Sequence, residues 1–477
     1  MCAESFSFRP PAPVPRADWP ALTDLVKTLW NNPIEAWTQA HFEQPIVRTR
    51  LPFANIVAVH DPAAIRRILS DNAENYPKDR FQKRILAVLS NGLLTAENEQ
   101  WRLQRRLISP LFTSKAVKGM APAMSETIDN FIAILSRHDG EIIDMAEATA
   151  SLALAVLERT MFSGGIGRDD LRAAMRTYFG ALGRIDPFDV LNLPDFIPRL
   201  SRLYARPAIR IFHRAVDDMI AARAAGLGGR ASDTSHDILN LLIEARDAES
   251  GRRLTQDEIR ANVITFFAAG HESTANTITW ALYLLTLSHE WRERVRKEAE
   301  TEMSGRSSSA IDRLIQTRAV IEESLRLYPP LAAISRVALA DDELAGMHVP
   351  AGTMVVISPY VLHRHRLWGE RADYFDPSRF LPGSREQIDR YAYLPFGAGA
   401  RGCIGSFFAL QQATLAVAAI TRNFELRVAP DHAVWPLHRI TLRPKDGLPM
   451  LVRRRPVGER KAQPRTIGSR PESLALH

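Results

Sequence analysis

Cys403 is the residue whose surroundings most clearly suggest chemistry. The chain has only two cysteines, and this one stands in the segment Phe396-Gly-Ala-Gly-Ala-Arg-Gly-Cys-Ile-Gly405. A lone internal cysteine is usually a small buried hydrophobe. Here, however, the glycines allow tight turns and a close approach of the backbone, and Arg401 places a positive charge two residues away. Backbone N–H groups and a nearby cation favour the deprotonated sulfur, so the segment favours a thiolate that binds a metal.

A second unusual segment lies within a long apolar run. Thr255-Gln-Asp-Glu258 has the capping-box pattern that begins a helix, and residues 259–287 continue it with mainly apolar residues. Small residues, an acid and two hydroxyls interrupt this run: Ala269, Gly270, Glu272, Ser273 and Thr274. A glycine inside a helix costs about 1 kcal/mol relative to alanine, and Ser or Thr hydroxyls can bond to the carbonyl four residues earlier. We therefore expect the helix to be loosened beside an acid.

The cysteine segment resembles the haem-binding loop of the cytochrome P450 superfamily, in which the cysteine thiolate is the axial ligand of the iron. The resemblance implies that Cys403 binds the iron of haem b (iron protoporphyrin IX), within a loop bounded by Phe396 and Gly405. It also implies that Arg401 pairs with a haem propionate. A thiolate ligand favours O–O cleavage. The implied fold is mainly α with small β-sheets (α+β), with the haem between the long helix and the cysteine loop.

Further propionate ligands follow from the same resemblance. Trp101 and Arg105 are four residues apart in a helical stretch, so both side chains project from one face. They match the family's Trp-x-x-x-Arg pattern, whose members hydrogen-bond the propionates; an amphipathic surface helix is the alternative. Arg336 matches another propionate-binding arginine of the family, and a solvated surface arginine is an equally open interpretation.

A structural network is expected around Glu323 and Arg326, which lie in a helix that must stop at Pro329-Pro330. Such a pair is otherwise a common surface ion pair of little net value. The segment Phe375-Asp-Pro-Ser-Arg-Phe380 resembles the family's partner segment, so Arg379 is expected to complete the network. Its implied role is to stabilise the backbone that leads into the cysteine loop.

The acid-bearing segment resembles the family's oxygen-activation motif, which implies that Glu272, Ser273 and Thr274 are catalytic and that Glu272 and the next hydroxyl relay protons. The family usually has threonine directly after the acid, whereas this chain has Ser273 followed by Thr274. Serine lacks the methyl group that restricts χ1, so we expect proton delivery that works but is less tightly controlled. His271 is expected to be a packed or pocket-rim histidine rather than an iron ligand.

The resemblance also implies a substrate pocket, although several of its residues could equally belong to an ordinary core. Its expected lining is mostly apolar and suits a hydrophobic small molecule such as a terpenoid, a fatty acid or an aromatic compound. The expected lining residues are Phe81, Phe266, Phe267, Ala269, Leu331, Ala332, Ala333, Ile334 and Ile440.

Electrons must come from another protein, because the chain has neither a Gly-x-Gly-x-x-Gly fingerprint nor a cysteine cluster for iron and sulfur. We expect a separate ferredoxin or flavodoxin, with a reductase that uses NAD(P)H. A basic docking face or a merely solvated one could be formed by Arg102, Arg106, Lys115 and Lys118. The expected activity is a monooxygenase that inserts one oxygen atom into a C–H bond. The alternatives are a haem-thiolate enzyme that uses peroxide or rearranges its substrate, and a non-catalytic haem sensor.

Composition and length favour one large domain. The 477 residues contain no obvious linker between residues 20 and 450, so we expect a flexible segment 1–20, a domain 21–455 and a disordered basic tail 456–477. Seven basic and two acidic residues from Leu451 onward supply +5 of the net charge of +7. Because most of this charge lies in the tail that we expect to be disordered, we expect no nucleic-acid partner. With few cysteines, no signal-peptide core and no membrane-spanning run, a soluble cytoplasmic protein is expected.

The pattern of residues also predicts individual elements. A hairpin is expected from residues 46–50 and 56–59 with its turn at 52–55, followed by a helix that begins at Asp61-Pro62 and runs through Leu69. Residues 101–299 should be almost entirely helical. Strands are expected again at residues 353–357 and near residues 440–452.

Overall fold

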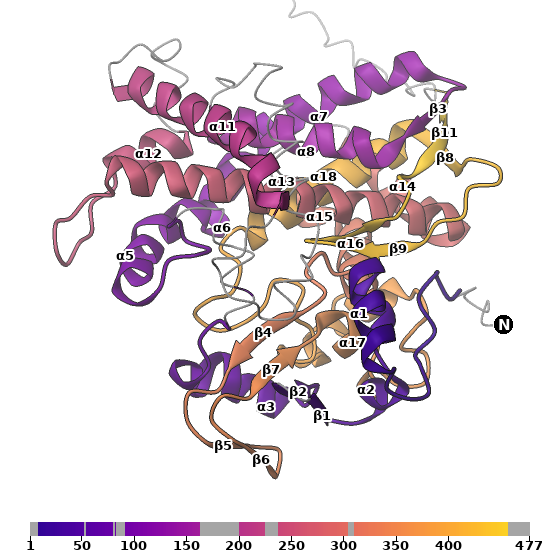
Figure 1. Ribbon diagram of the computed structural model, residues 1–477. Coiled ribbons are helices and arrows are strands. Elements are labelled where there is room, and N and C mark those ends of the chain that lie inside the picture. Colours follow the sequence, from indigo (N-terminus) through magenta and orange to yellow (C-terminus); the bar gives the residue numbers. More distant parts are fainter. Residues whose placement is uncertain are drawn as a thin grey trace, which may run out of the picture.

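The computed structural model describes residues 8–51, 54–79, 82, 91–162, 200–224, 237–303 and 310–456. Most of these residues are helical, and the larger sheet lies on one side of the helical body (Figure 1). Within these described ranges, every helix is too short or too polar to cross a membrane. Phe81 and the basic tail from residue 457 onward, both named in the sequence-based expectations, lie outside the described residues.

The central element is helix α13 (Gln256–Leu287), which packs against α8, α16 and α18. Its capping box is present as expected: the Glu258 N–H donates to Thr255 Oγ1 at 3.2 Å, and the Thr255 N–H donates to a Glu258 carboxylate oxygen at 2.9 Å. The helix is continuous through Gly270, and most of its residues are buried. The expected loosening beside the acid is therefore not seen as a break in the helix.

The remaining described helices surround α13 or cover the sheet. They are α1 (Leu22–Asn31), α2 (Gln39–Glu43), α3 (Pro62–Arg66), α5 (Asn98–Ile108), α6 (Ser114–Gly119), α7 (Ala121–Leu135), α8 (Met145–Met161), α11 (Leu200–Ala224), α12 (Ile238–Glu244), α14 (His289–Glu302), α15 (Ala310–Arg313), α16 (Ile315–Leu327), α17 (Pro359–Leu362) and α18 (Ser406–Asn423). Helix α16 ends before the double proline, as expected.

Four small sheets complete the described fold. The largest has the strand order β1-β2-β7-β4, in which β2 and β7 are parallel and the other pairs antiparallel. A second has the order β3-β11-β8, and β9–β10 and β5–β6 are two-stranded. The strands are β1 (Ile46–Leu51), β2 (Ala54–Val59), β3 (Ile142–Asp144), β4 (Ile334–Val337), β5 (Asp342–Leu344), β6 (Met347–Val349), β7 (Met354–Ile357), β8 (Phe424–Val428), β9 (Pro436–His438), β10 (Leu442–Pro444) and β11 (Pro449–Arg454).

Three details differ from the expectations. The stretch 101–299 contains strand β3, which pairs with β11 from the far end of the domain. The helix after Asp61 is α-helical only to Arg66 and continues as a π-turn over residues 67–71. Residues 8–20, expected to be flexible, contact the body: Phe8 packs on Phe375 with ring centroids 5.4 Å apart, because an aromatic side chain gains from burial.

Candidate functional site

The cysteine loop is fixed by its own backbone and by a close contact with another segment. The Cys403 N–H donates to the Phe396 carbonyl at 2.8 Å, which closes the loop. Gly399 has φ +69°, and a Cβ atom there would lie 1.9 Å from the Leu69 carbonyl oxygen. Only glycine combines this backbone conformation with this proximity. The loop therefore lies directly before α18 and against the end of the π-turn.

Cys403 is an exposed residue at the end of the loop. Burial raises the pKa of the Cys403 thiol, while the N–H of Gly405 and the charge of Arg105 act in the opposite direction. A metal-bound thiolate needs such nearby donors and positive charge, so the surroundings of the sulfur suit a metal ligand.

Positive charges converge beside this loop. The Arg401 guanidinium lies over the Trp101 ring at 4.0 Å from its centroid and donates to the Ala96 carbonyl at 2.8 Å. Burial, together with the charges of Arg336 and Arg105 and against the opposing charge of Glu97, lowers the pKa of Arg401 to about 10. Burial also lowers the pKa of Arg105, and that of Arg336 against the opposing charge of Asp79. Arg401 thus lies close enough to be repelled by both of the other arginines.

The arrangement fits the haem that the resemblance implies. Arg105, in α5, donates to the Gly402 carbonyl at 2.9 Å and is thereby bound to the cysteine loop. Arg336 donates to Gln82 at 3.1 Å from strand β4. Clustered buried cations need anionic partners, and two propionates would supply two negative charges. The described residues hold no group of three or more His, Cys, Asp and Glu side chains suited to a metal ion, so a single thiolate remains the ligand to consider.

Glu323 and Arg326 form a fully buried pair in α16. Arg326 donates to both carboxylate oxygens of Glu323 at 2.6 and 2.7 Å. The remaining donors reach the carbonyls of His363, Ala372 and Tyr374 at 2.5 to 2.8 Å. Because both side chains are fully buried, this pair is not a surface ion pair. Its arginine also satisfies the backbone carbonyls of a long irregular segment.

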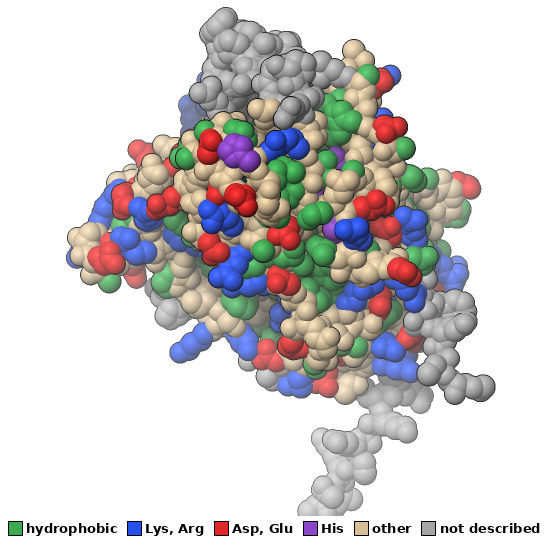
Figure 2. Space-filling model, turned by 90° about the horizontal axis from the view of Figure 1, so that it is seen from below, with side chains coloured by type: hydrophobic (Ala, Val, Ile, Leu, Met, Phe, Trp, Pro, Cys, Tyr) green, Lys and Arg blue, Asp and Glu red, His purple; other side chains and the backbone are tan. Residues whose placement is uncertain are grey.

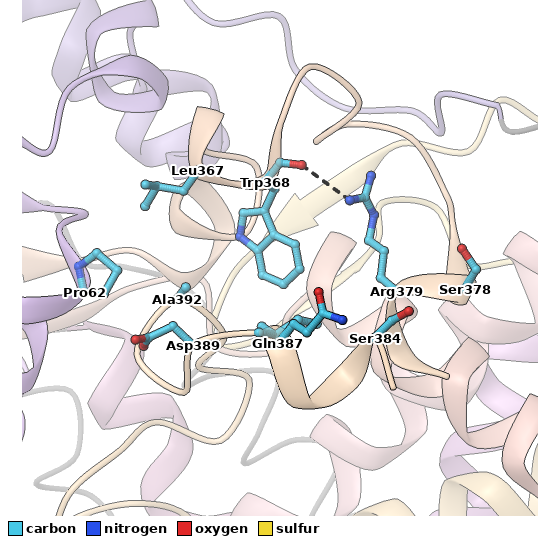
Figure 3. A pocket seen from close by; sticks show the side chains of 10 residues that line it. Pro62, Leu367, Trp368, Ser378, Arg379, Ser384, Gln387, Asp389 and Ala392 are labelled. Carbon is cyan, nitrogen blue, oxygen red and sulfur yellow. Dashed lines mark hydrogen bonds between the residues drawn. The ribbon is translucent and has the colours of Figure 1, made fainter. Parts of the chain in front are cut away.

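Arg379 does not bond to Glu323, contrary to the expected three-residue network. It donates to the carbonyls of Arg371 at 2.9 Å and Trp368 at 3.4 Å, and the second contact is drawn in Figure 3 beside an open surface pocket of about 530 Å³. Burial and the charge of Arg326 lower the pKa of Arg379. The charge of Glu323 acts in the opposite direction, so Arg379 is attracted by this carboxylate although its hydrogen bonds go to the backbone segment.

His363 connects this network to the cysteine loop and was missed by sequence reasoning. Its Nε2 accepts from the Leu394 N–H at 2.8 Å, so its Nδ1 carries the proton and donates to the Arg326 carbonyl at 3.2 Å. Burial lowers the pKa of His363 to about 3, which keeps the ring neutral. Leu394 lies two residues before Phe396, and so the histidine fixes the start of the loop.

The expected acid segment, residues 269–274, lies within α13. Glu272 Oε1 accepts from the Thr441 hydroxyl at 2.6 Å, and the Ser273 hydroxyl donates to the Ala269 carbonyl at 2.5 Å, one turn earlier. Thr274 is buried. His271 packs toward the Ala150 backbone, as the packed interpretation expected, and burial lowers its pKa.

Several expected pocket residues pack as core residues do. Phe267 is fully buried and stacks on Phe162 at 4.8 Å, and Phe266 packs against Phe112 at 5.3 Å. Ala332 and Ile334 are also buried. Ala269 and Leu331 are exposed, whereas Ala333 and Ile440 are half-buried. The contacts of the two aromatic residues favour the alternative of an ordinary core, and their place at a pocket stays a prediction.

Gly270 packs against the neighbouring helix α8. A Cβ atom at Gly270 would lie 3.2 Å from a methyl carbon of Leu157 in α8. The small residue that leaves space is Ala269, which is exposed in a helix that is otherwise mostly buried.

A buried amide pair, also missed by sequence reasoning, joins α13 to α5 and the preceding turn. Asn262 donates to Gln104 at 3.1 Å and accepts from the Leu93 N–H at 2.8 Å. Gln104 donates in turn to the Asn91 carbonyl at 3.0 Å. Neither amide belongs to a recognisable motif, and only their complete burial marks them as structural.

The expected basic docking face is largely neutralised. Arg102 pairs with Glu99 and Glu74, Arg106 with Asp247 and Glu249, and Lys118 with Asp312. On the face shown in Figure 2, basic and acidic side chains are likewise interspersed. These pairs favour the interpretation of a solvated surface over that of a concentrated positive field.

The chain is similar to known proteins in both fold and sequence. The heme domain of cytochrome P450DA has a TM-score of 0.80 at 23% identity, covering 94% of this chain and 99% of that one. A cyclooctat-9-en-7-ol 5-monooxygenase of Streptomyces melanosporofaciens is 33% identical over 84% of this chain and 87% of the relative. A pentalenene oxygenase of Streptomyces avermitilis is 32% identical over 89% of this chain and 94% of the relative.

The fold is that of the cytochrome P450 heme domains. The family model described as Cytochrome P450 matches residues 12–449, and the chain belongs to this family. It is a haem-dependent monooxygenase whose electrons come from NAD(P)H through redox partners, and which acts on a small molecule with dioxygen.

Proposed function

We propose that the chain hydroxylates a hydrophobic small molecule, with Cys403 as the axial thiolate ligand of the haem iron. The bound haem would supply the activation of dioxygen by two electrons and two protons. The single observation that carries the assignment is the exposed residue Cys403 beside the cluster of Arg105, Arg336 and Arg401. These arginines and Trp101 would bind the propionates.

Proton delivery is proposed for the acid segment of α13. Glu272 accepts a hydrogen bond from the Thr441 hydroxyl, and the hydroxyl of the next residue, Ser273, donates to the Ala269 carbonyl. These two groups would pass protons in turn. Thr274 is buried and would support the helix rather than take part in the relay. Glu323, Arg326 and Arg379 would stabilise the loops around the haem.

The substrate is proposed to be a terpenoid. The relatives named pentalenene oxygenase and cyclooctat-9-en-7-ol 5-monooxygenase favour this class, and the exposed Leu331 and half-buried Ile440 offer apolar contacts. A separate ferredoxin or flavodoxin with its reductase would supply electrons. The acid and hydroxyl pair favours dioxygen over peroxide as the oxidant, and the cytoplasmic location stays a prediction.

Two variants and two ligands test this function. Cys403→Ala should abolish the thiolate spectrum of the haem protein, whereas Cys2→Ala should leave it unchanged because that residue is remote from the motif. Pentalenene and cyclooctat-9-en-7-ol would then be titrated against the wild-type absorption spectrum, followed by turnover with a ferredoxin, its reductase and NADPH. An unchanged spectrum in Cys403→Ala would contradict the ligand assignment.

A further inference from the structure

The β9–β10 hairpin contacts one face of α13 at three positions spaced four residues apart. These positions are Glu272, Asn276 and Trp280. Residues at this spacing lie above one another on a helix. The hairpin therefore follows the helix for two turns, beginning at the acid that the proposed function uses for proton delivery.

Thr441 is the centre of this contact. Its hydroxyl accepts a hydrogen bond from the Asn276 side-chain amide at 2.9 Å and donates to Glu272 Oε1 at 2.6 Å. An amide nitrogen can only donate, and a hydroxyl has a single proton. With its acceptor side occupied by Asn276, the Thr441 hydroxyl directs its proton at Glu272. A donor aimed at a carboxylate oxygen fixes the orientation of that carboxylate.

The backbone on both sides of Thr441 is also fixed. The Trp280 indole donates to the Leu442 carbonyl at 3.1 Å, and the Leu442 N–H donates to the Pro330 carbonyl at 2.9 Å. The Arg439 N–H donates to the Thr441 carbonyl at 3.1 Å. The hydroxyl is thus presented to Glu272 from a turn whose own position is set by other elements.

We propose that Thr441 is a positioning residue for proton delivery: its hydroxyl, oriented by Asn276, holds the Glu272 carboxylate in one orientation. The inference rests on the proposed relay through Glu272 and names the residues that control it. Ile440, expected at the substrate pocket, precedes Thr441 in the same turn. The hairpin therefore joins a wall of that pocket to the proton-donating acid.

The test compares hydrogen peroxide with water as products of dioxygen reduction, with ferredoxin, its reductase and NADPH but no added substrate. Two electrons and two protons convert dioxygen to hydrogen peroxide, whereas four of each convert it to two waters. Poor proton delivery favours peroxide. We expect Thr441→Val to raise the ratio of peroxide to water about ten-fold, less than the ~10²–10⁴ that a complete general acid contributes.

Further variants separate position from stability. Thr441→Ser keeps the hydroxyl and should stay close to wild type. Asn276→Asp replaces the donor by an acceptor, which draws the Thr441 proton away from Glu272 and should act like Thr441→Val. Thr286→Val is the matched control, because its hydroxyl bonds only to the Tyr283 carbonyl at 2.6 Å in the same helix, and it should leave the ratio unchanged.

A second readout does not depend on turnover. The guanidinium unfolding free energies of Thr441→Val, Glu272→Gln and the double variant form a double-mutant cycle. We expect the double variant to lose less stability than the sum of the single variants, because the two side chains interact directly.

The outcomes distinguish the two proposals. A raised ratio in Glu272→Gln and Thr441→Val, with recovery in Thr441→Ser, supports both. A raised ratio in Glu272→Gln alone, or additive unfolding energies, overturns the role of Thr441 and leaves the proposed function standing. An unchanged ratio in Glu272→Gln overturns the relay itself, and the role of Thr441 falls with it.

Discussion

Gly399 shows how a single residue determines the shape of the cysteine loop. Its backbone has a positive φ, and the Leu69 carbonyl oxygen lies where a side chain would begin. The loop thereby approaches the segment after α3 without a gap, and it is closed by the bond from the Cys403 N–H to the Phe396 carbonyl. A substitution at Gly399 should therefore change the position of the Cys403 sulfur, four residues later.

We expect Gly399→Ala to lower the free energy of unfolding by more than the about 1–2 kcal/mol that a left-handed conformation costs a non-glycine residue. The added contact with Leu69 forces the loop to move, so haem content should fall as well. Gly383→Ala is the control, because φ is +89° there and its surroundings are open. Chemical denaturation and haem absorbance measure both effects. Equal losses in the two variants would contradict the argument.

Single-residue predictions from sequence were accurate where a motif is local and weak where the partner is remote. The capping box at Thr255 spans four residues and is present. Thr441, by contrast, is 169 residues from Glu272, and a lone threonine carries no signal of that contact. Arg379 was expected to join Glu323 and is attracted by its charge, but its hydrogen bonds go to the carbonyls of Arg371 and Trp368, which the sequence does not reveal.

At the scale of elements, three histidines lie together where α2, the end of β2 and the segment before residue 366 meet. His60 lies 6.0 Å from His41 and stacks on His365 at 5.7 Å, between ring centroids. Burial, with the charges of His41 and His365, lowers the pKa of His60 to about 3, and burial lowers that of His41 to about 4. The folded protein keeps these rings neutral.

This stack predicts acid sensitivity. The unfolded chain binds protons below about pH 6.5 while the folded stack does not, so stability is complete above that pH and is lost as pH falls toward about 3. His60 alone should account for about 2 kcal/mol between pH 7.5 and pH 5, at 1.36 kcal/mol per pH unit. Unfolding by guanidinium at both pH values measures this loss, and His60→Leu should reduce it. An equal loss in His60→Leu would contradict the assignment.

The elements themselves were predicted well where hydrophobic periodicity extends over many residues. The hairpin β1–β2, the long helix α13 and strand β7 were confirmed close to their expected bounds. The short strand β3 was not expected, because three residues carry no period and its stability comes from pairing with β11. For a related reason, the sequence could not decide whether Phe266 and Phe267 belong to a pocket or to the core, since periodicity does not reveal which neighbour a helix face contacts.

At the scale of the whole molecule, the segment before α1 closes over one end of α16. The Phe375 N–H donates to the Phe8 carbonyl at 3.0 Å, and the Tyr328 hydroxyl donates to the Pro11 carbonyl at 2.8 Å. Arg9 pairs with Asp373 at 2.6 Å. These contacts cover the segment whose carbonyls accept from Arg326, so the start of the described chain supports the buried ion pair.

Phe8→Ala should therefore lower the free energy of unfolding by about 1–3 kcal/mol, because a partly buried aromatic contact is lost. Val14→Ala is the matched control, since Val14 is 84% exposed and such substitutions usually stay within about 0.5 kcal/mol. Denaturant titration of the full chain compares the two. Equal values would show that the segment is not part of the cooperative unit.

The three converging arginines have a consequence for which macrocycle the chain accepts. Arg401 is repelled by Arg105 and Arg336 in a desolvated region, so an anionic occupant would be favoured over a neutral one. A porphyrin whose carboxylates are esterified would match the flat shape of haem without supplying those negative charges. We therefore expect the arginines to distinguish acidic macrocycles from neutral ones of the same size.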